Sequence, residues 1–351
     1  MVPGSSDPDP PAVSRRNFIR LTSAGLLALV WPKRPGRPAR QAQFSLDEQL
    51  GRVTPAELTL YQSPDSTSMV VRTVPRDSLL PITHVTIGAE EPAHNRVWYR
   101  IGQEGYAHSG SIQPVQNIFN EPRSDLPRQG QLAEITVPFS DGRYHPGEEY
   151  AVLYRVYYET THWVDRLVHD RRGNPWYRVR EDRWDLIYYI QAEHARLLAQ
   201  QDLAPLAPDV PAEAKRIQVS LDHQTVTAYE WERPVFMTRA ATGAKFSNGS
   251  FLTPQGRFLT FHKRPSRHMA AGNLAANGFD LPGVPWVCYI NEKGVALHGT
   301  YWHNDFGRPR SHGCINLPSQ AARWFYLWTQ PVVPPDEQRL YEDFGTIIDI
   351  Y

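Results

Sequence analysis

The segment Leu297–Asn316 decides the fold and reads LHGTYWHNDFGRPRSHGCIN. Near its end stands Cys314, with His312 two positions before it and His298 sixteen positions before it. A cysteine is a good nucleophile only as the thiolate, and the pKa of a free thiol is about 8.5, so a nearby imidazole can take the proton or stabilise the thiolate as an ion pair. A polar loop, Tyr301–Arg310, lies between the two short segments that contain His298 and Cys314. The segment therefore predicts a cysteine–histidine site.

The spacing favours His298 as the base. In an extended segment, residues i and i+2 point the same way but lie about 6.6 Å apart, which is long for a hydrogen bond between His312 and Cys314. His298 comes from a separate strand end and can approach freely. Gly313 leaves the backbone unobstructed, so the amides of Gly313 and Cys314 are candidates for an oxyanion hole, worth about 3–4 kcal/mol per donor.

Two other interpretations of these side chains stay open. A zinc site would use His298, His303, His312 and Cys314, which are acceptable ligand types. Their spacing is not compact, so we expect neither a metal nor a cofactor. The second cysteine, Cys288, lies in an apolar strand and is expected to be a core residue. A disulfide between Cys288 and Cys314 would block catalysis and give an oxidised off state.

Together with segments upstream, this stretch resembles the YkuD-type L,D-transpeptidase family. The resemblance covers about residues 212–351, and Ala241 stands where the family usually has Ser before a Thr-Gly turn. The supporting segments are Ile217–Leu221 with Gln224, Thr242-Gly243, Thr253–Phe258 and Leu281–Trp286.

The resemblance implies a reaction on peptidoglycan. Cys314 attacks the penultimate residue of a donor stem tetrapeptide, His298 acts as base, and the Gly299 carbonyl orients its ring. Terminal D-Ala leaves, a thioester forms, and the acceptor amine of a neighbouring stem completes a 3-3 cross-link. The resemblance also implies that β-lactams of the carbapenem class are inhibitors.

The remaining site residues are expected around this pair. The resemblance implies that Ser311 and His312 line the cleft and that Asn316 braces the loop behind the cysteine. Tyr301 and Trp302, which open the loop, are expected to contact substrate. Two alternatives remain: an L,D-carboxypeptidase, with water as acceptor at the same site, and a cell-wall-binding protein with an inert catalytic domain. The intact cysteine–histidine pair argues against the inert domain.

Upstream of a proline-rich linker at 202–211, the pattern of short strands and turns predicts β modules. Residues 58–115 resemble the bacterial SH3-like module, which would allow cell-wall binding. The phrase Trp98–Ile101 recurs as Trp176–Val179, which suggests a second, divergent module, and Glu193–Gln201 looks briefly helical. We predict an SH3-like module at 43–122, a second β-rich, SH3-like candidate at 123–205, and the catalytic domain at 206–351.

The predicted fold class is therefore mainly β. The C-terminal part is expected to be a β-rich, YkuD-like sandwich with one or two short helices, of which Ser319–Thr329 is the clear one. One or two SH3-like β-barrel modules are expected before it. The chain contains 31 Pro and 23 Gly, which suits short elements joined by turns.

The first 42 residues differ from the rest in charge. They hold seven basic and two acidic residues, which leaves the remainder with a net charge of −5. A mildly acidic body argues against a nucleic-acid partner, because phosphate binding needs a basic face. Arg15-Arg16 followed by the apolar run Leu21–Trp31 resembles a twin-arginine signal. We expect an exported protein of the cell wall or periplasm, with a membrane tether by an uncleaved signal left open.

Overall fold

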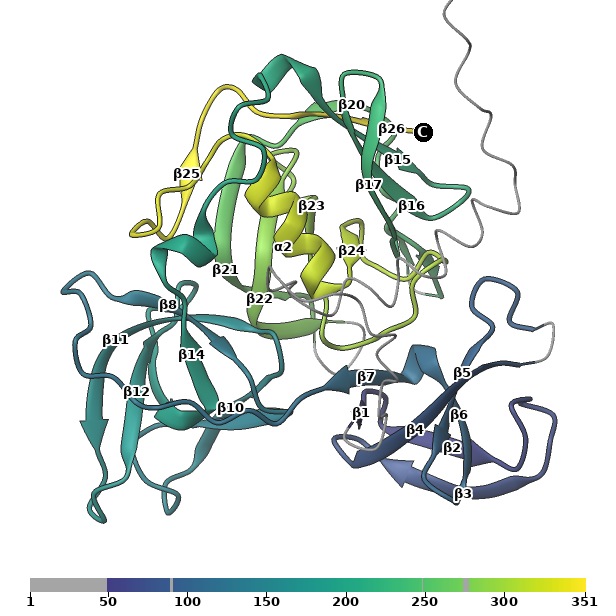
Figure 1. Cartoon of the computed structure of the whole chain (residues 1–351), viewed down its shortest axis with the longest axis horizontal. Helices are drawn as coiled ribbons and strands as arrows, with labels where there is room; N and C mark the ends of the chain where they lie inside the picture. Colours follow the sequence, from purple (N-terminus) through teal and green to yellow (C-terminus); the bar gives the residue numbers. More distant parts are fainter. Residues whose placement is uncertain (1–48, 89–90, 248, 274–277) are drawn as a thin grey trace, which may run out of the picture. The chain divides into compact units, whose positions relative to one another are not determined.

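The computed structural model describes residues 49–88, 91–247, 249–273 and 278–351 (Figure 1). These residues belong to one compact unit, Ser45–Tyr351. The predicted export signal lies outside the described residues. Within the described part of the chain, no helix has the length and apolar character needed to cross a membrane.

The first part of the unit is a seven-stranded sheet in the order β3-β2-β6-β5-β4-β1-β7. Neighbouring strands pair antiparallel, and their inward side chains, such as Leu60, Ile82 and Ile101, form a separate apolar core. The strands are β1 (Leu50–Val53), β2 (Glu57–Tyr61), β3 (Val70–Pro75), β4 (Leu79–Ile87), β5 (Val97–Ile101), β6 (Gly105–His108) and β7 (Ile112–Val115), with the 3-10 turn η2 (Ser109–Ser111) before β7.

The second part repeats this strand order as β10-β9-β13-β12-β11-β8-β14. The echoed phrases lie on corresponding strands, and Trp98 on β5 and Trp176 on β12 are both fully buried. The assignment of either sheet to the SH3-like class remains a prediction. The strands are β8 (Gln131–Ile135), β9 (Phe139–Arg143), β10 (Val152–Tyr157), β11 (Thr161–His169), β12 (Pro175–Arg180), β13 (Ile187–Gln191) and β14 (Ala195–Leu197).

The segment expected to be briefly helical, Glu193–Gln201, contains a strand instead. Its first residues belong to the 3-10 turn η3 (Ala192–His194), which β14 follows. Its last residues begin another 3-10 turn, η4 (Gln200–Leu203). Ala195 pairs with Ile135 and Leu197 with Ala133, so the segment supplies the last strand of the second sheet. The free edge of β8 thus overrides a weak local helix preference.

The third part contains two five-stranded sheets, β17-β16-β15-β26-β20 and β24-β23-β22-β21-β25, and a small hairpin, β18-β19. The elements are 3-10 turn η5 (Ala212–Ala214), β15 (Lys215–Ser220), β16 (Thr225–Glu230), β17 (Arg233–Arg239), β18 (Lys245–Phe246), β19 (Gly249–Ser250), β20 (Gly256–Leu259), β21 (His262–Ala271), β22 (Phe279–Tyr289), β23 (Ala296–Gly299), β24 (Ile315–Leu317), β25 (Leu340–Tyr341) and β26 (Ile347–Ile350). The prediction of a mainly β protein is confirmed.

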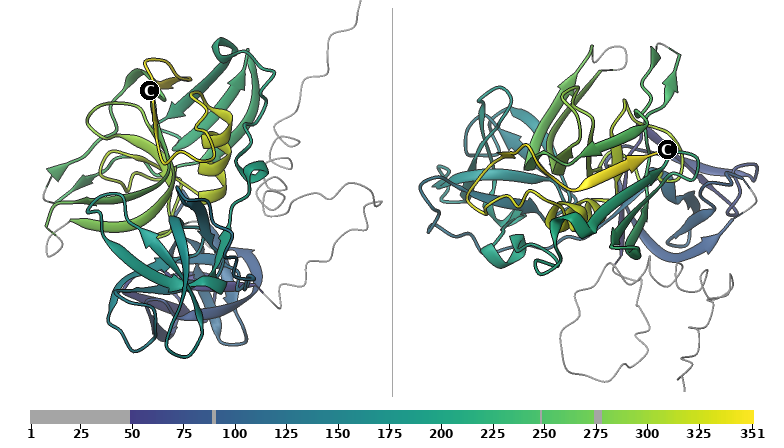
Figure 2. Two further views of the ribbon diagram at one scale, coloured as in Figure 1. Left: turned by 90° about the vertical axis from the view of Figure 1, so that its left-hand side faces the viewer. Right: turned by 90° about the horizontal axis from the view of Figure 1, so that it is seen from above.

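The helix α2 (Ser319–Trp328) lies between the two five-stranded sheets (Figures 1 and 2). Its Phe325 is fully buried in the same core as Val219 of one sheet and Leu297 of the other. Trp324 stacks on Phe236 of β17 with ring centroids 4.3 Å apart. The core therefore fixes the strand that carries His298 against the helix that follows Cys314.

A buried lysine caps the end of α2. The Lys263 ammonium donates to the carbonyls of Tyr326 (2.6 Å), Thr329 (2.8 Å) and Pro331 (2.7 Å), and burial lowers its pKa to about 8. The last carbonyls of a helix have no partner within the helix, so such a donor satisfies groups that would otherwise stay unpaired. No local sequence pattern predicts this cap, because Lys263 lies more than sixty residues before the carbonyls that it binds.

Replacing Lys263 with Met is expected to lower the free energy of unfolding by about 3 kcal/mol, because several buried carbonyls lose their donor. Urea denaturation followed by circular dichroism measures the change. Lys293→Met is the matched control, because Lys293 is exposed in a turn and should change stability by less than about 0.5 kcal/mol. Equal losses from the two variants would contradict the capping role.

Candidate active site

The predicted nucleophile and base come from two neighbouring parallel strands. In the ladder of β23 and β24, Leu297 lies opposite Ile315 and His298 opposite Asn316. Side chains alternate along strands, so Leu297 and Ile315 enter the core while His298 and Asn316 share the other face. Cys314 directly precedes β24, and by the same alternation it belongs to the face of His298. Two residues sixteen positions apart thus lie on one surface.

His298 is held as a neutral imidazole. Its Nδ1 lies 2.9 Å from the Gly299 carbonyl, which can only accept, so Nδ1 carries the proton and Nε2 keeps its lone pair. Burial lowers the pKa of His298 to about 4, although the bond to Gly299 works in the opposite direction. The Trp302 ring lies beside it, with centroids 5.7 Å apart. This geometry leaves Nε2 available as a base.

Cys314 is a half-buried thiol in this arrangement. Burial raises its pKa to about 11, and a hydrogen bond from the Ala296 amide to the sulfur opposes that shift. The sulfur also lies 3.6 Å from the Gly294 carbonyl. Among the described residues, no hydrogen bond joins the Cys314 and His298 side chains. The pair is therefore a neutral thiol and a neutral imidazole at pH 7, and the proton must move as the thiol attacks.

The backbone before Cys314 is fixed from both sides. Gly313 has a φ of +115°, a conformation that glycine adopts without strain. Its carbonyl accepts from Thr253 Oγ1 at 2.8 Å, and the Ser311 hydroxyl donates to the Cys314 carbonyl. The Gly313 N–H, expected as an oxyanion donor, is directed at Ser311 Oγ, 3.1 Å away. It is thus engaged inside the loop, which leaves the Cys314 amide as the candidate donor of the predicted pair.

The segments that carried the family resemblance meet behind this loop. The Gln224 side chain accepts from the Thr242 amide (2.9 Å) and donates to its hydroxyl (2.7 Å). The Thr242 carbonyl in turn accepts the amides of Arg310 and Ser311. Gln224, between β15 and β16, and the Thr242-Gly243 turn therefore hold the backbone at Arg310 and Ser311 in place.

Thr253 is a support that the sequence marked only as part of a motif. Besides its bond to the Gly313 carbonyl, Thr253 Oγ1 accepts from the Gly243 amide at 2.8 Å. A Cβ on Gly243 would lie 2.1 Å from the Phe251 carbonyl oxygen, so only glycine fits there. The Thr-Pro-x-Gly-x-Phe pattern was the available signal, but its side-chain partners could not be read from it.

His312 lies at the surface among phenylalanines. Its ring stacks on Phe246 with centroids 4.8 Å apart, and Phe251 and Phe279 lie 4.8 and 5.6 Å away. Partial burial lowers its pKa. These contacts suit a residue on the wall of a cleft, and within the described residues His312 makes no hydrogen bond to Cys314.

Tyr301 does not lie where a substrate contact was expected. It is fully buried, its hydroxyl donates to the Pro282 carbonyl at 3.2 Å, and its ring stacks on Tyr157 of the second sheet. Its side chain therefore supports the loop. Trp302 is half-buried beside His298 and is the residue of this pair that is free to contact a substrate.

The second cysteine and His303, which a disulfide or a zinc site would use, have other surroundings in the structure. Cys288 and Cys314 are both free thiols, and Cys288 is buried in the core. His303 accepts from the Asp305 amide at Nδ1 (3.2 Å), and its Nε2 lies 3.1 Å from the Asn316 side-chain amide. The described residues contain no group of three or more side chains arranged to hold a metal ion.

Comparisons with known proteins bear on the part of the chain that holds this site. Residues 214–336 match the family model YkuD, the L,D-transpeptidase catalytic domain. None of the curated proteins matches the chain.

Several solved structures resemble it at low identity. An Enterococcus faecium L,D-transpeptidase variant is 20% identical, with 39% of this chain and 50% of that chain covered and a TM-score of 0.31. A Mycobacterium smegmatis L,D-transpeptidase is 18% identical, with 55% and 89% covered and a TM-score of 0.32. L,D-transpeptidase 3 from Mycobacterium tuberculosis, in complex with a faropenem-derived adduct, is 17% identical, with 47% and 73% covered and a TM-score of 0.32. The chain thus spans about half the length of the E. faecium protein.

Proposed function

We propose that the protein is a cysteine-dependent peptidoglycan L,D-transpeptidase that forms 3-3 cross-links. The observation that carries this proposal is the neutral imidazole of His298, fixed through Nδ1, on the same strand face as the thiol of Cys314. That face lies within the segment that matches the catalytic-domain family. A thiol with a base on the same strand face and a fixed backbone behind it is suited to acyl transfer.

In the first half-reaction, His298 Nε2 takes the Cys314 proton as the sulfur attacks the carbonyl of the penultimate stem residue. The tetrahedral oxyanion accepts a hydrogen bond from the Cys314 amide. When the intermediate collapses, the carbon–nitrogen bond to the terminal D-Ala breaks, and His298 returns the proton to the leaving amine. A thioester on Cys314 remains.

In the second half-reaction, the amine of a neighbouring stem attacks the thioester. His298 takes a proton from that amine and returns one to the departing thiolate, so the enzyme regains its thiol. Water in place of the amine gives an L,D-carboxypeptidase.

Incubation of the full chain with disaccharide-tetrapeptide stems, followed by mass spectrometry, tests the proposal. Loss of D-Ala with a covalent dimer is the expected result. Loss of D-Ala with tripeptide products alone would replace the proposal by the carboxypeptidase. Unchanged stems with a folded, reduced protein would instead favour a cell-wall-binding protein with an inert catalytic domain.

A carbapenem is expected to acylate Cys314 once per chain. The strained β-lactam carbonyl presents the same electrophile as the stem peptide, and the ring-opened product stays on the sulfur as a thioester. The M. tuberculosis structure with a faropenem-derived adduct supports this expectation for a β-lactam. Intact-mass spectrometry after a short incubation detects the adduct. Prior treatment with iodoacetamide should prevent it, and an adduct that persists in Cys314→Ala would contradict the site.

We also propose that residues 1–42 direct export and that the two seven-stranded sheets contribute to cell-wall binding. Replacing Arg15 and Arg16 with Lys is expected to retain the protein in the cytoplasm, because the twin-arginine route reads that pair. Cell fractionation with immunoblotting measures the distribution. Unchanged export of the double variant would indicate the general secretory route.

A further inference from the structure

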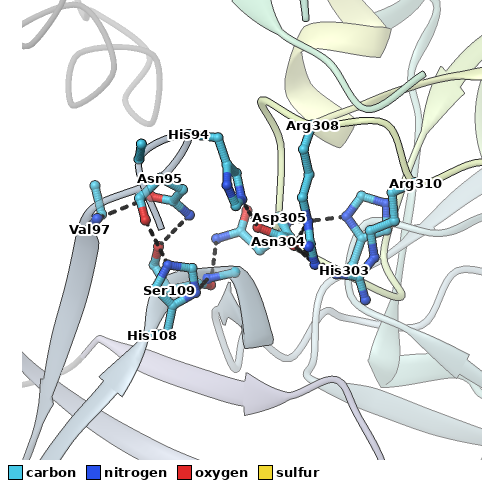
Figure 3. A network of polar contacts seen from close by, with 12 residues as sticks. His94, Asn95, Val97, His108, Ser109, His303, Asn304, Asp305, Arg308 and Arg310 are labelled. Atoms are coloured by element: carbon cyan, nitrogen blue, oxygen red, sulfur yellow. Dashed lines mark hydrogen bonds and ion pairs between the residues drawn. The ribbon is translucent and has the colours of Figure 1, made fainter. Parts of the chain in front are cut away.

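A buried carboxylate stands in the middle of the loop that joins the base to the nucleophile. Asp305 Oδ1 accepts from His94 Nε2 at 2.8 Å, and its Oδ2 accepts from Arg308 Nε (2.7 Å) and Arg310 Nη1 (2.8 Å) (Figure 3). Burial by itself raises the pKa of Asp305, but the bond from His94 and the two guanidinium groups lower it to about 2. Asp305 is therefore charged, and its oxygens are occupied from two parts of the chain.

The first seven-stranded sheet reaches the same loop by its backbone. The Asn304 amide donates to the Gly110 carbonyl (3.1 Å), and its side chain donates to the Ser109 carbonyl (3.3 Å). A Cβ on Gly110 would lie 2.8 Å from Asp305 Oδ1, so a glycine here permits the close approach. Asn95, next to His94, donates to Ser109 Oγ (3.0 Å) and ties the two contact points together (Figure 3).

Asp305 is linked to Cys314 along two routes that avoid the reacting atoms. On one, the Asp305 amide donates to His303, whose other ring nitrogen meets the side chain of Asn316, the ladder partner of His298. On the other, Asp305 holds the side chain of Arg310, which directly precedes Ser311. The backbone amide of Asp305 thus serves the first route, and its carboxylate serves the second, which ends next to Ser311.

We propose that Asp305 is a positioning residue for the Cys314–His298 pair and that His94, between β4 and β5, completes its site. The inference rests on the proposed function of that pair. It assigns the first seven-stranded sheet a part in the turnover of the enzyme, besides any part in binding the cell wall. A residue that acts through others in this way affects the alignment of the thiol and the imidazole more than the affinity for the stem peptide.

The test compares Asp305→Asn with a matched control in the full-length protein. Asp165 is the control, because it is also a largely buried carboxylate, bound by Arg178 (2.7 and 2.8 Å) and Arg180 (3.3 Å) within the second sheet. D305N is expected to lower kcat at least tenfold while KM changes less than threefold. D165N should keep kcat within twofold of the wild type at a temperature where all proteins are folded.

The rate of Cys314 alkylation by iodoacetamide, followed against pH, reports the surroundings of the thiol, which a loss of overall stability does not change while the protein stays folded. A loosened loop exposes the thiol, so the midpoint of the profile should fall by at least one pH unit in D305N and stay unchanged in D165N. An unchanged profile and an unchanged kcat in D305N would overturn the inference. They would leave the proposed function intact as long as Cys314→Ala is inactive.

The His94 variants keep the inference testable if D305N does not fold. His94 is partly exposed, and its Nε2 is the atom that meets Asp305. His94→Ala should lower kcat at least threefold, whereas His94→Gln, whose side-chain N–H can still donate, should retain more than half of it. Equal kcat values for these two variants would overturn the part assigned to the first sheet. Turnover by Cys314→Ala would instead overturn the proposed function.

Discussion

Replacing Cys314 with Ala is expected to lower turnover of tetrapeptide stems at least about 10⁴-fold, because the nucleophile of the thioester route is lost. Cys314→Ser should be almost as inactive. A hydroxyl has a much higher pKa than a thiol, so the same imidazole activates a serine far less than a cysteine. Release of D-Ala, measured by a coupled assay, reports the rate. Activity above a tenth of the wild type in either variant would contradict the mechanism.

Cys288→Ser is the matched control for these variants. Cys288 is a fully buried free thiol of β22, and burial raises its pKa, so it is poorly suited to act as a nucleophile. The substitution should preserve turnover and cost roughly 1 kcal/mol of stability. A folded Cys288→Ser protein without activity would show that the second cysteine belongs to the site.

Replacing His298 with Ala is expected to lower turnover about 10³-fold, within the range for loss of a general base. The reason is the neutral ring, whose Nε2 is left as the basic atom by the bond from Nδ1 to the Gly299 carbonyl. Because burial lowers the pKa of His298 to about 4, the base is deprotonated above about pH 5. As the pH is lowered, wild-type turnover should therefore fall only near pH 4, where His298 becomes protonated. The residual activity of His298→Ala should not show this fall.

His312→Ala provides the comparison, since His312 precedes the same cysteine but packs among Phe246, Phe251 and Phe279. Its loss should reduce turnover less than tenfold, mainly through a higher KM, because the cleft wall changes and the base remains. If His312→Ala proves the more damaging variant and also shifts the pH profile of Cys314 alkylation, the two histidines have the opposite roles.

The sequence by itself determined the elements whose signals are local. Alternating apolar residues and frequent turn residues predicted a mainly β protein, and the apolar face of 319–329 with Pro331 after it predicted α2, observed at Ser319–Trp328. The recurrence of Trp98–Ile101 at Trp176–Val179 indicated a repeat, and the two sheets have the same strand order. The spacing also favoured His298 over His312 as the base, since i and i+2 positions along one extended segment are too far apart for a short contact.

Tertiary structure alone decided what each side chain meets. Tyr301 is polar enough to line a cleft, but packing against Tyr157 buries it. The Gly313 amide was expected to donate to an oxyanion, but in the structure it donates to the Ser311 hydroxyl oxygen. His94 and Asp305 are 211 positions apart, and no local pattern pairs them. Periodicity and spacing specify which residues share a strand face, whereas partners across sheets depend on how whole elements pack, because burial and hydrogen bonding there are set by residues distant in the chain.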